Sequence, residues 1–490
     1  MNYSYATLAR ALMPEMALVA GALLVLGYDL FVGRRHSPAE RLQASLWIGG
    51  LALVAAIFDA ISVGPLGLLY GDTLIIDPLA LATRVGVLGL GLITLGVVAG
   101  ARLPRHPAEY VAIILFALTG FTLMAAAHQL LVAFVALELA SLSLYVLAGF
   151  AKDRRESAEA GLKYFLFGGM ASAFLLFGFS LIYGLTGELE LGRIAVVLAH
   201  RGISPLLAVA LVMVLVAFGF KAAAAPFHLW APDAYEGAPT PSAALIASAS
   251  KLAGFIFFLR LLWPGLGALA GDVSVSGNHG GWLTLVAILA GASLLLGNVA
   301  ALAQSNLRRL LAYSAIAHTG AMLLGVIAAS PDASGPGPLF FYLATYGVAT
   351  AGAFGVVAVL ECNGGCQKIT DLAGLSRRSP LLAGCLGIFI LSLAGIPPLA
   401  GFFGKFAVFA AALKLGGLAG PAGWLTVLAI LLSAVALYYY LLVLKQALVA
   451  APAAHSSRIR VSAVPAIALI FAAGLIVCLG VFPSLLLNLF

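Results

Sequence analysis

The sequence predicts an all-α membrane protein that crosses the bilayer many times, and three observations lead to that fold class. Apolar residues make up 63% of the 490 residues, whereas charged residues make up only 9%. The mean hydropathy is +1.10. Apolar stretches recur along the whole chain, each near the ~20 residues that a helix needs to cross a membrane. This composition excludes a soluble globular fold.

We predict fourteen spanning helices, taken in order along the chain. Their approximate ranges are residues 11–32, 42–63, 75–100, 109–127, 130–150, 160–184, 205–235, 240–263, 281–302, 307–329, 338–360, 380–413, 423–449 and 461–488. The first follows Arg10, as a signal peptide would follow a basic residue, but many apolar segments come after it. We therefore expect it to remain in the membrane.

The basic residues between the segments support this number, because Lys and Arg collect on the cytoplasmic connections of membrane proteins. The connections after odd-numbered segments carry fifteen: Arg34, Arg35, Arg41, Arg102, Arg105, Lys152, Arg154, Arg155, Arg308, Arg309, Lys368, Arg377, Arg378, Arg458 and Arg460. The opposite side carries four, which are Arg10, Arg193, Arg201 and Lys414. The alternation predicts that both termini lie on the non-cytoplasmic side.

The seventh and twelfth segments are too long for simple spans. As straight helices they would measure about 46 and 51 Å, against a hydrocarbon core of about 30 Å. Pro226 interrupts the first, and Gly395, Pro397 and Pro398 interrupt the second. Broken helices at membrane depth are typical of ion pathways, because the freed backbone groups need water or a neighbour.

These two segments lie five helices apart and so run in opposite directions, as an inverted-topology repeat requires. We predict that helices 4–8 and 9–13 form the two repeats. The expected units are a three-helix segment over residues 1–105, repeats over 106–265 and 280–450, and a final helix over 460–490.

Three lysines within the segments point to function. Lys221, Lys251 and Lys405 each lie about ten or more residues from either end of the span, too deep for the side chain to reach the interface easily. Burial disfavours the charged ammonium and makes such a lysine able to release its proton near neutral pH. We expect all three to line a hydrated path; the alternative is a set of structural ion pairs.

Other charged residues within segments are closer to span ends. We interpret Arg84, Arg260 and Lys445 as side chains that extend to the interface. Lys163 follows Glu159 by four residues, which favours either a surface ion pair or a functional role.

Glu138 is the one carboxylate as deep as the three lysines. An ion pair with Lys221 would hold the lysine's proton, and loosening the pair would release it. The alternative is a pair that only specifies helix packing. His228 and His318 lie where a proton relay would need them, although a histidine in a helix is often only a packing residue.

The sequence offers little sign of a metal or nucleic-acid site. Cys362 and Cys366 form a C-x3-C pair in a polar loop, while Cys385 and Cys478 lie in apolar segments, so their spacing builds no four-ligand cluster. The Lys and Arg residues are dispersed rather than gathered in a patch, which argues against nucleic acid. Asp233 and Glu236, at the loop end of the seventh segment, are expected to be solvated.

Several stretches resemble the antiporter-like membrane subunits of proton-pumping NADH:quinone oxidoreductase (respiratory complex I), and the N-type subunit most of all. These are PFHLWAPDAYEGAPTP, SNLRRLLAYSAIAHTG and LSLAGIPPLAGFFGKF. The resemblance spans nearly the whole chain. It places the family's ionisable line on Glu138, Lys221, Lys251 and Lys405, with Lys163 and His228 also matching. Ala315 stands where many relatives have serine.

The resemblance implies a proton-translocating subunit in a bacterial inner membrane, driven by quinone reduction elsewhere. NADH, FMN, iron–sulfur clusters and quinone are then expected in partner subunits, with no cofactor and no metal in this chain. The implied partners are other membrane subunits, especially the M-type subunit and small membrane subunits. The alternatives are a component of a multi-subunit monovalent cation/proton antiporter or of a ferredoxin- or hydrogenase-linked complex, and a purely structural membrane subunit.

Overall fold

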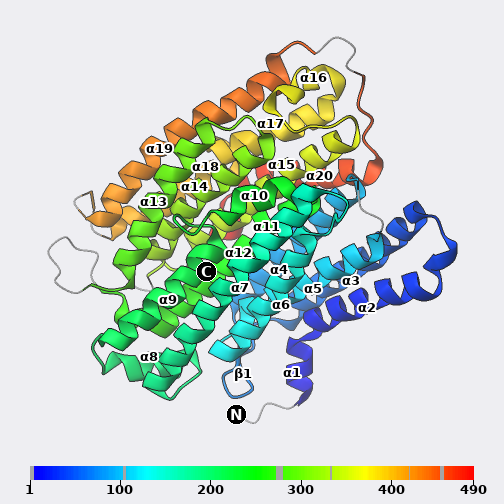
Figure 1. Ribbon diagram of the computed structural model, residues 1–490. Helices are drawn as coiled ribbons and strands as arrows, with labels where there is room; N and C mark the ends of the chain where they lie inside the picture. The colour runs from blue at the N-terminus through cyan, green and yellow to red at the C-terminus, as the bar shows by residue number, and fades with distance from the viewer. Residues whose placement is uncertain are drawn as a thin grey trace.

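The computed structural model describes residues 5–102, 106–271, 280–330, 334–415, 417–418, 420–452 and 457–490; Arg105 lies outside them. Its long helices lie side by side in one bundle (Figure 1). Thirteen helices of the described residues are long and apolar enough to cross a membrane. The remaining predicted segment, residues 380–413, is divided into two shorter helices. The prediction of fourteen crossings is therefore confirmed.

The spanning helices follow the predicted order. They are α2 (Met13–Phe31), α3 (Pro38–Val63), α4 (Pro78–Ala99), α5 (Pro107–Ala126), α6 (Leu130–Ala148), α7 (Arg155–Thr186), α9 (Pro205–Ala222), α11 (Thr240–Ala247) with α12 (Ala249–Arg260), α13 (Trp282–Leu302), α14 (Leu307–Ala328), α15 (Gly337–Cys362), α17 (Pro380–Ala394) with α18 (Ala400–Lys414), α19 (Pro421–Leu444) and α20 (Ala463–Val481). Short helices are α1 (Tyr5–Ala11), α8 (Leu191–Ala199), α10 (Trp230–Gly237), α16 (Leu375–Arg378) and α21 (Ser484–Leu487).

Local sequence explains where many of these helices begin. A proline stands in the first turn of α3, α4, α5 and α9, where its missing N–H costs no helical hydrogen bond. The side chains of Asp77 and Ser204 accept hydrogen bonds from the first backbone N–H groups of α4 and α9. The Asn306 side chain caps α14 in the same way.

The connections meet in two separate sets, as alternating crossings require. At one end of the bundle, the loop at Asn306 bridges to the loop at Lys368, and Arg308 on α14 pairs with Glu361 on α15. Most of the predicted cytoplasmic Lys and Arg residues lie on the connections of this end, which we call the arginine-rich end. At the other end, Gln129 bridges to Glu190.

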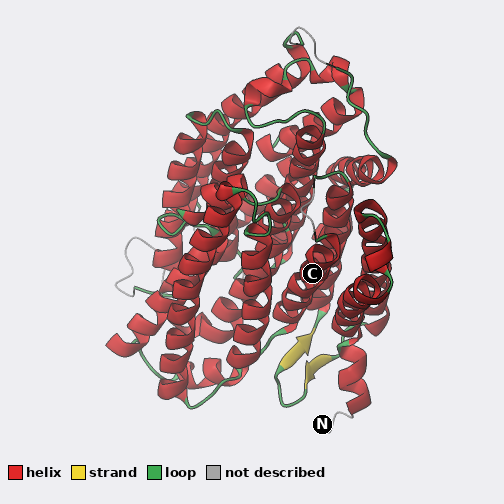
Figure 2. Ribbon diagram, turned by 45° about the vertical axis from the view of Figure 1, so that its right-hand side comes forward, coloured by secondary structure: helices red, strands yellow, loops and turns green. Residues whose placement is uncertain are grey.

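Two elements at this other end were missed from the sequence. A two-stranded hairpin, β1 (Gly67–Leu69) and β2 (Leu74–Ile76), precedes α4, and the short helix α8 follows α7. Figure 2 shows the hairpin at one end of the bundle. The third predicted helix starts at residue 75, because the apolar residues of β2 (LII) read as part of it. In the structure the helix α4 begins at Pro78.

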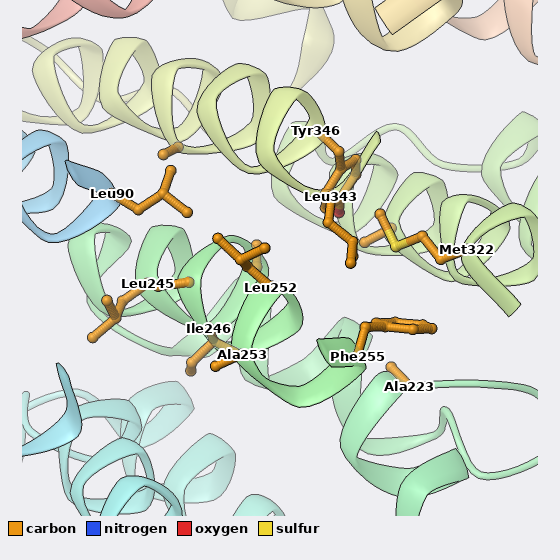
Figure 3. Close-up of a cluster of buried hydrophobic side chains, with 14 of the residues drawn as sticks. Leu90, Ala223, Leu245, Ile246, Leu252, Ala253, Phe255, Met322, Leu343 and Tyr346 are labelled. Atoms are coloured by element: carbon orange, nitrogen blue, oxygen red, sulfur yellow. The ribbon is translucent and has the colours of Figure 1, made fainter. Parts of the chain in front are cut away.

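The centre of the bundle is the α11–α12 segment, all of whose residues are buried. Figure 3 shows Leu252 and Phe255 of α12 among apolar side chains that include Met322 of α14 and Leu343 of α15. The segment is interrupted at Ser248, whose φ and ψ of −114° and −83° are not helical. Lys251 therefore lies one turn from a backbone irregularity in an apolar core.

Two arginines contradict the prediction that they extend to the interface. Arg84 is fully buried and pairs with Glu15 at 2.9 Å, while its other nitrogens donate to the carbonyls of Ala11 and Thr122. Arg260 pairs with Asp77, the cap of α4. Each arginine pairs with a carboxylate that belongs to another helix or its cap. Sequence spacing does not reveal such pairs, because the partners are far apart in the chain. Lys445 is exposed near a span end, in agreement with its prediction.

Candidate functional site

Helix α9 ends at Ala222, one residue after Lys221, and the chain resumes as α10 after seven non-helical residues. This is the predicted break of the seventh segment. The groups freed by the break find partners. The Trp230 indole donates to the Phe220 carbonyl at 3.0 Å, Thr319 donates to the Ala222 carbonyl at 2.8 Å, and the Ala225 N–H donates to Ser293 at 2.9 Å. Side chains of α10, α13 and α14 thus satisfy the backbone groups that the break leaves free.

Lys221 lies in the last turn of α9, where the helix dipole favours a positive charge. Its Nζ donates to the Ser141 hydroxyl of α6 at 2.9 Å. Glu138, on the same helix as Ser141, accepts a hydrogen bond from Ser172 of α7 instead. Within the described part of the chain, Glu138 and Lys221 form no direct ion pair of the kind that we expected. Ser141 lies three residues beyond Glu138, about one helical turn away, and its own hydroxyl donates to the Leu137 carbonyl at 2.7 Å.

Lys221 and Lys251 line the same small cavity between α9 and α12. Its other lining residues include Ser250 and Gly254, and the Lys221 side chain lies against Gly254. A second small cavity is lined by Lys221 together with Ser141 and Tyr145 of α6 and Ser172 of α7. Lys221 therefore lines two cavities whose walls include hydroxyl groups.

Lys251 is held by α14. Its Nζ donates to the Ala315 carbonyl and to the Thr319 hydroxyl, both at 2.6 Å, and lies 5.5 Å from the centre of the Tyr346 ring. Because Ala315 contributes its backbone oxygen, this contact does not depend on which side chain stands at position 315. Thr319 also reaches the Ala222 carbonyl, so it joins Lys251 to the end of α9. Sequence reasoning missed Thr319, since one threonine in an apolar helix carries no distinguishing signal.

His318 lies next to Thr319 on α14, within a cluster of tyrosines from two other helices. Its Nδ1 lies 2.6 Å from the Tyr342 hydroxyl of α15, and its Nε2 lies 3.1 Å from the Tyr440 hydroxyl of α19. Tyr440 also bonds to Ser314. Both ring nitrogens are thus in hydrogen bonds, one to a tyrosine of α15 and the other to a tyrosine of α19. A histidine bonded in this way can take up a proton on one nitrogen and release it from the other, as a proton relay requires.

Lys405 occupies the second break. Helix α17 ends at Ala394 and α18 begins at Ala400, and the Lys405 Nζ donates to the last carbonyls of α17, those of Leu393 and Ala394, at 3.0 and 3.1 Å. Gly395, with φ of +86°, brings the chain close to the lysine side chain. Lys405 satisfies the carbonyls that the break leaves free and lies at the negative end of the helix dipole.

The three deep lysines are 8%, 3% and 8% exposed in chain order, and none of them pairs with a carboxylate among the described residues. The buried hydroxyls of Tyr346 and Thr350, one turn apart on α15, have no hydrogen-bond partner on another helix among the described residues. Buried polar groups without a protein partner are usually satisfied by water. The line from Ser141 to Lys405 is thus a chain of polar groups in an apolar bundle.

Two predicted residues stand apart from this line. His228 lies in the first break and is buried, but its Nδ1 makes no hydrogen bond to the described residues. Lys163 pairs with Glu159 at 2.7 Å, in agreement with the spacing, and with Asp233 at 2.6 Å. Asp233 and Glu236 both pair with Arg309, so the expectation that they are merely solvated is wrong.

Comparison with known proteins identifies this architecture. The family described as NADH:quinone oxidoreductase/Mrp antiporter, TM, matches residues 127–457. NADH-quinone oxidoreductase subunit N 2 of Acidobacterium capsulatum is 45% identical over 99% of this chain and 99% of its own length. A chain of respiratory complex I from Thermus thermophilus with bound aureothin superposes with a TM-score of 0.79 at 34% identity, covering 97% of this chain and 99% of its own.

A chain of the Mrp complex from Dietzia sp. has the same fold, with a TM-score of 0.80 over 99% of this chain and 96% of its own, at only 22% identity. The higher identities lie with the quinone oxidoreductase branch. This protein therefore belongs to the family of antiporter-like membrane subunits of NADH:quinone oxidoreductase, in its subunit N branch.

Proposed function

We propose that this subunit moves protons along the line of Glu138, Lys221, Lys251, His318 and Lys405. The observation that carries the proposal is the shared cavity of Lys221 and Lys251, because it brings two deep lysines from different helices to one space. A proton that leaves one ammonium therefore has a second basic group in the wall of the same cavity. Ser141, Thr319 and Tyr346 supply hydroxyls along the way.

Each residue has a distinct role in this proposal. Glu138, one helical turn from Ser141 on α6, stabilises the charge on Lys221 electrostatically, without a direct hydrogen bond. Lys251 receives the proton, His318 and its tyrosine partners carry it across α14, and Lys405 passes it to the exit. Moving one charge against 100 mV requires about 2.3 kcal/mol, so the gain or loss of one charged hydrogen bond is of the right size to control the step.

The orientation and cofactor content are also part of the proposal. The excess of Lys and Arg at the arginine-rich end supports a cytoplasmic location for that end and both termini on the opposite side of the bacterial inner membrane. Redox cofactors and the quinone belong to partner subunits, and the energy reaches this chain through its contacts with other membrane subunits of the complex. The two repeats, residues 106–265 and 280–450, supply one broken helix each.

The experiment compares Glu138→Gln and Lys221→Met in assembled complex in inverted membrane vesicles, with NADH oxidation and vesicle acidification measured together. Lys445→Met, which removes an exposed lysine near a span end, is the matched control. We expect both site variants to lower acidification relative to the control. Acidification at the control rate and with the control yield per NADH in both variants would remove the proposed role.

A further inference from the structure

The short helix α10 is joined to its neighbours by non-helical backbone at both ends. Ala223, at the end of α9, has a left-handed φ of +57°, and Ala238, after α10, is extended. An eight-residue helix between two such joints takes its position from side-chain contacts rather than from a continuous helix. Its contacts with α7 and α14 therefore decide where the first break lies.

Ionic contacts from both repeats meet on α10. Lys163 of α7 pairs with Asp233 at 2.6 Å, and Arg309 of α14 bonds to Asp233 at 2.9 Å and to Glu236 at 2.8 Å. Asn306, the cap of α14, adds a hydrogen bond to Glu236 at 2.8 Å. We call Lys163, Asp233, Glu236 and Arg309 the α10 ionic cluster.

Arg308 holds the backbone of the same segment. Its Nε donates to the Tyr235 carbonyl at 2.9 Å, and its other nitrogens reach the Ala238 carbonyl and Glu361. The first turn of α14 thus binds the side chains and the backbone of α10. Gly237 allows close packing against α7, since a Cβ there would lie 2.3 Å from the Glu156 carbonyl oxygen.

Helix α14 therefore contacts the chain on both sides of the first break. Before the break, Thr319 donates to the Ala222 carbonyl. After the break, Arg309 holds Asp233. The two contact points on α14 are ten residues apart, or about 15 Å along one continuous helix. Because Thr319 also holds Lys251, the geometry between Lys221 and Lys251 depends on how α10 sits on α14.

We propose that Arg309 and Asp233 are positioning residues, which fix the first break against α14 so that Lys221 and Lys251 share one cavity. This inference rests on the proposed proton line. It gives a part in the transfer to two charged residues that lie outside that line. The side chains of both are 30% exposed, so each contact is of the kind that contributes modestly to stability. Their effect is expected on transfer more than on folding.

The experiment measures proton translocation per assembled complex in vesicles for Arg309→Gln, Asp233→Asn and the conservative Arg309→Lys. We expect the first two to lower translocation about threefold to tenfold, and Arg309→Lys to restore most of it. The double variant should lower translocation by less than the product of the two single effects, because the residues share the Arg309–Asp233 contact; their separate contacts to Glu236 and Lys163 add what remains. Arg41→Gln, which breaks the Arg41–Asp29 pair between α2 and α3, is the matched control.

A covalent link tests positioning directly and also serves if the charge variants assemble poorly. In a chain whose four native cysteines are replaced by serine, Asp233→Cys with Arg309→Cys lacks the ionic contact. A bifunctional thiol reagent that joins the two cysteines should recover translocation. No recovery on cross-linking, or Arg309→Gln at the Arg41→Gln rate, would overturn the inference. Lys251→Met in the same vesicles separates the two proposals. If Lys251→Met loses translocation while Arg309→Gln stays normal, the proton line stands and only the positioning role is disproved.

Discussion

Replacement of Thr319 by valine tests the link between the first break and Lys251. Valine keeps the shape of the side chain but removes the hydroxyl. Lys251 then retains one acceptor, the Ala315 carbonyl, and the Ala222 carbonyl loses its donor. A hydrogen bond to a charged group contributes about 1.5–3 kcal/mol. Since ~1.4 kcal/mol is a factor of ten, losing this hydrogen bond should slow a step that needs Lys251 held in place by about ten- to a hundredfold.

The assay is vesicle acidification per NADH oxidised, measured in assembled complex with Thr319→Val and Thr319→Ser side by side. We expect a large loss of acidification with valine and near-normal acidification with serine, which keeps the hydroxyl. If the valine variant acidifies vesicles as fast as the serine variant, the Thr319 hydroxyl has no part in the path and the reasoning fails.

Three further predictions concern other parts of the chain. Arg84→Leu leaves Glu15 charged and buried, so we expect it to destabilise the subunit by about 3–5 kcal/mol, whereas Arg84→Leu with Glu15→Leu should recover much of the loss in thermal unfolding. Gly395→Ala places a Cβ 3.1 Å from the Lys405 Cδ at a φ of +86°, which should cost about 1–2 kcal/mol and reduce acidification; unchanged melting and acidification would refute this. Burial lowers the pKa of His128 below its ordinary value, so the neutral histidine contributes stability above the unfolded pKa of about 6.5 and loses it as the pH falls toward the folded pKa. Limited proteolysis near α8, whose cap Glu190 lies 3.0 Å from the His128 Nε2, should therefore speed up on acidification in the native chain and less in His128→Gln.

The number and order of the spanning helices could be predicted from the sequence because two independent signals agree. Hydropathy gives the apolar segments, and the alternation of Lys and Arg fixes how many crossings separate them. The two broken helices were also predictable, since Pro226 and Pro397 interrupt segments longer than the bilayer. Short elements were missed, because three-residue strands and a nine-residue helix carry too little periodicity.

The deep lysines were also predictable from the sequence. A lysine far from both ends of a span is unusual in any arrangement of the helices, because its charge cannot reach water. Their partners were not, because tertiary contacts join residues far apart in the chain. Lys221 meets Ser141 rather than Glu138, and Lys251 meets a backbone carbonyl and a threonine. Depth within one segment gave no warning that Arg84 and Arg260 pair with carboxylates of other helices.

The proton yield per NADH of purified complex reconstituted in liposomes tests the central claim most directly when this chain carries Lys221→Met together with Lys251→Met. The double change removes both basic groups from the shared cavity and should interrupt the line in the middle. We predict that the double variant pumps fewer protons per NADH, or that its NADH oxidation and its proton pumping slow together. The Lys445→Met control should keep the normal rate and yield. A double variant that oxidises NADH and pumps protons at the rate and yield of Lys445→Met would contradict the account.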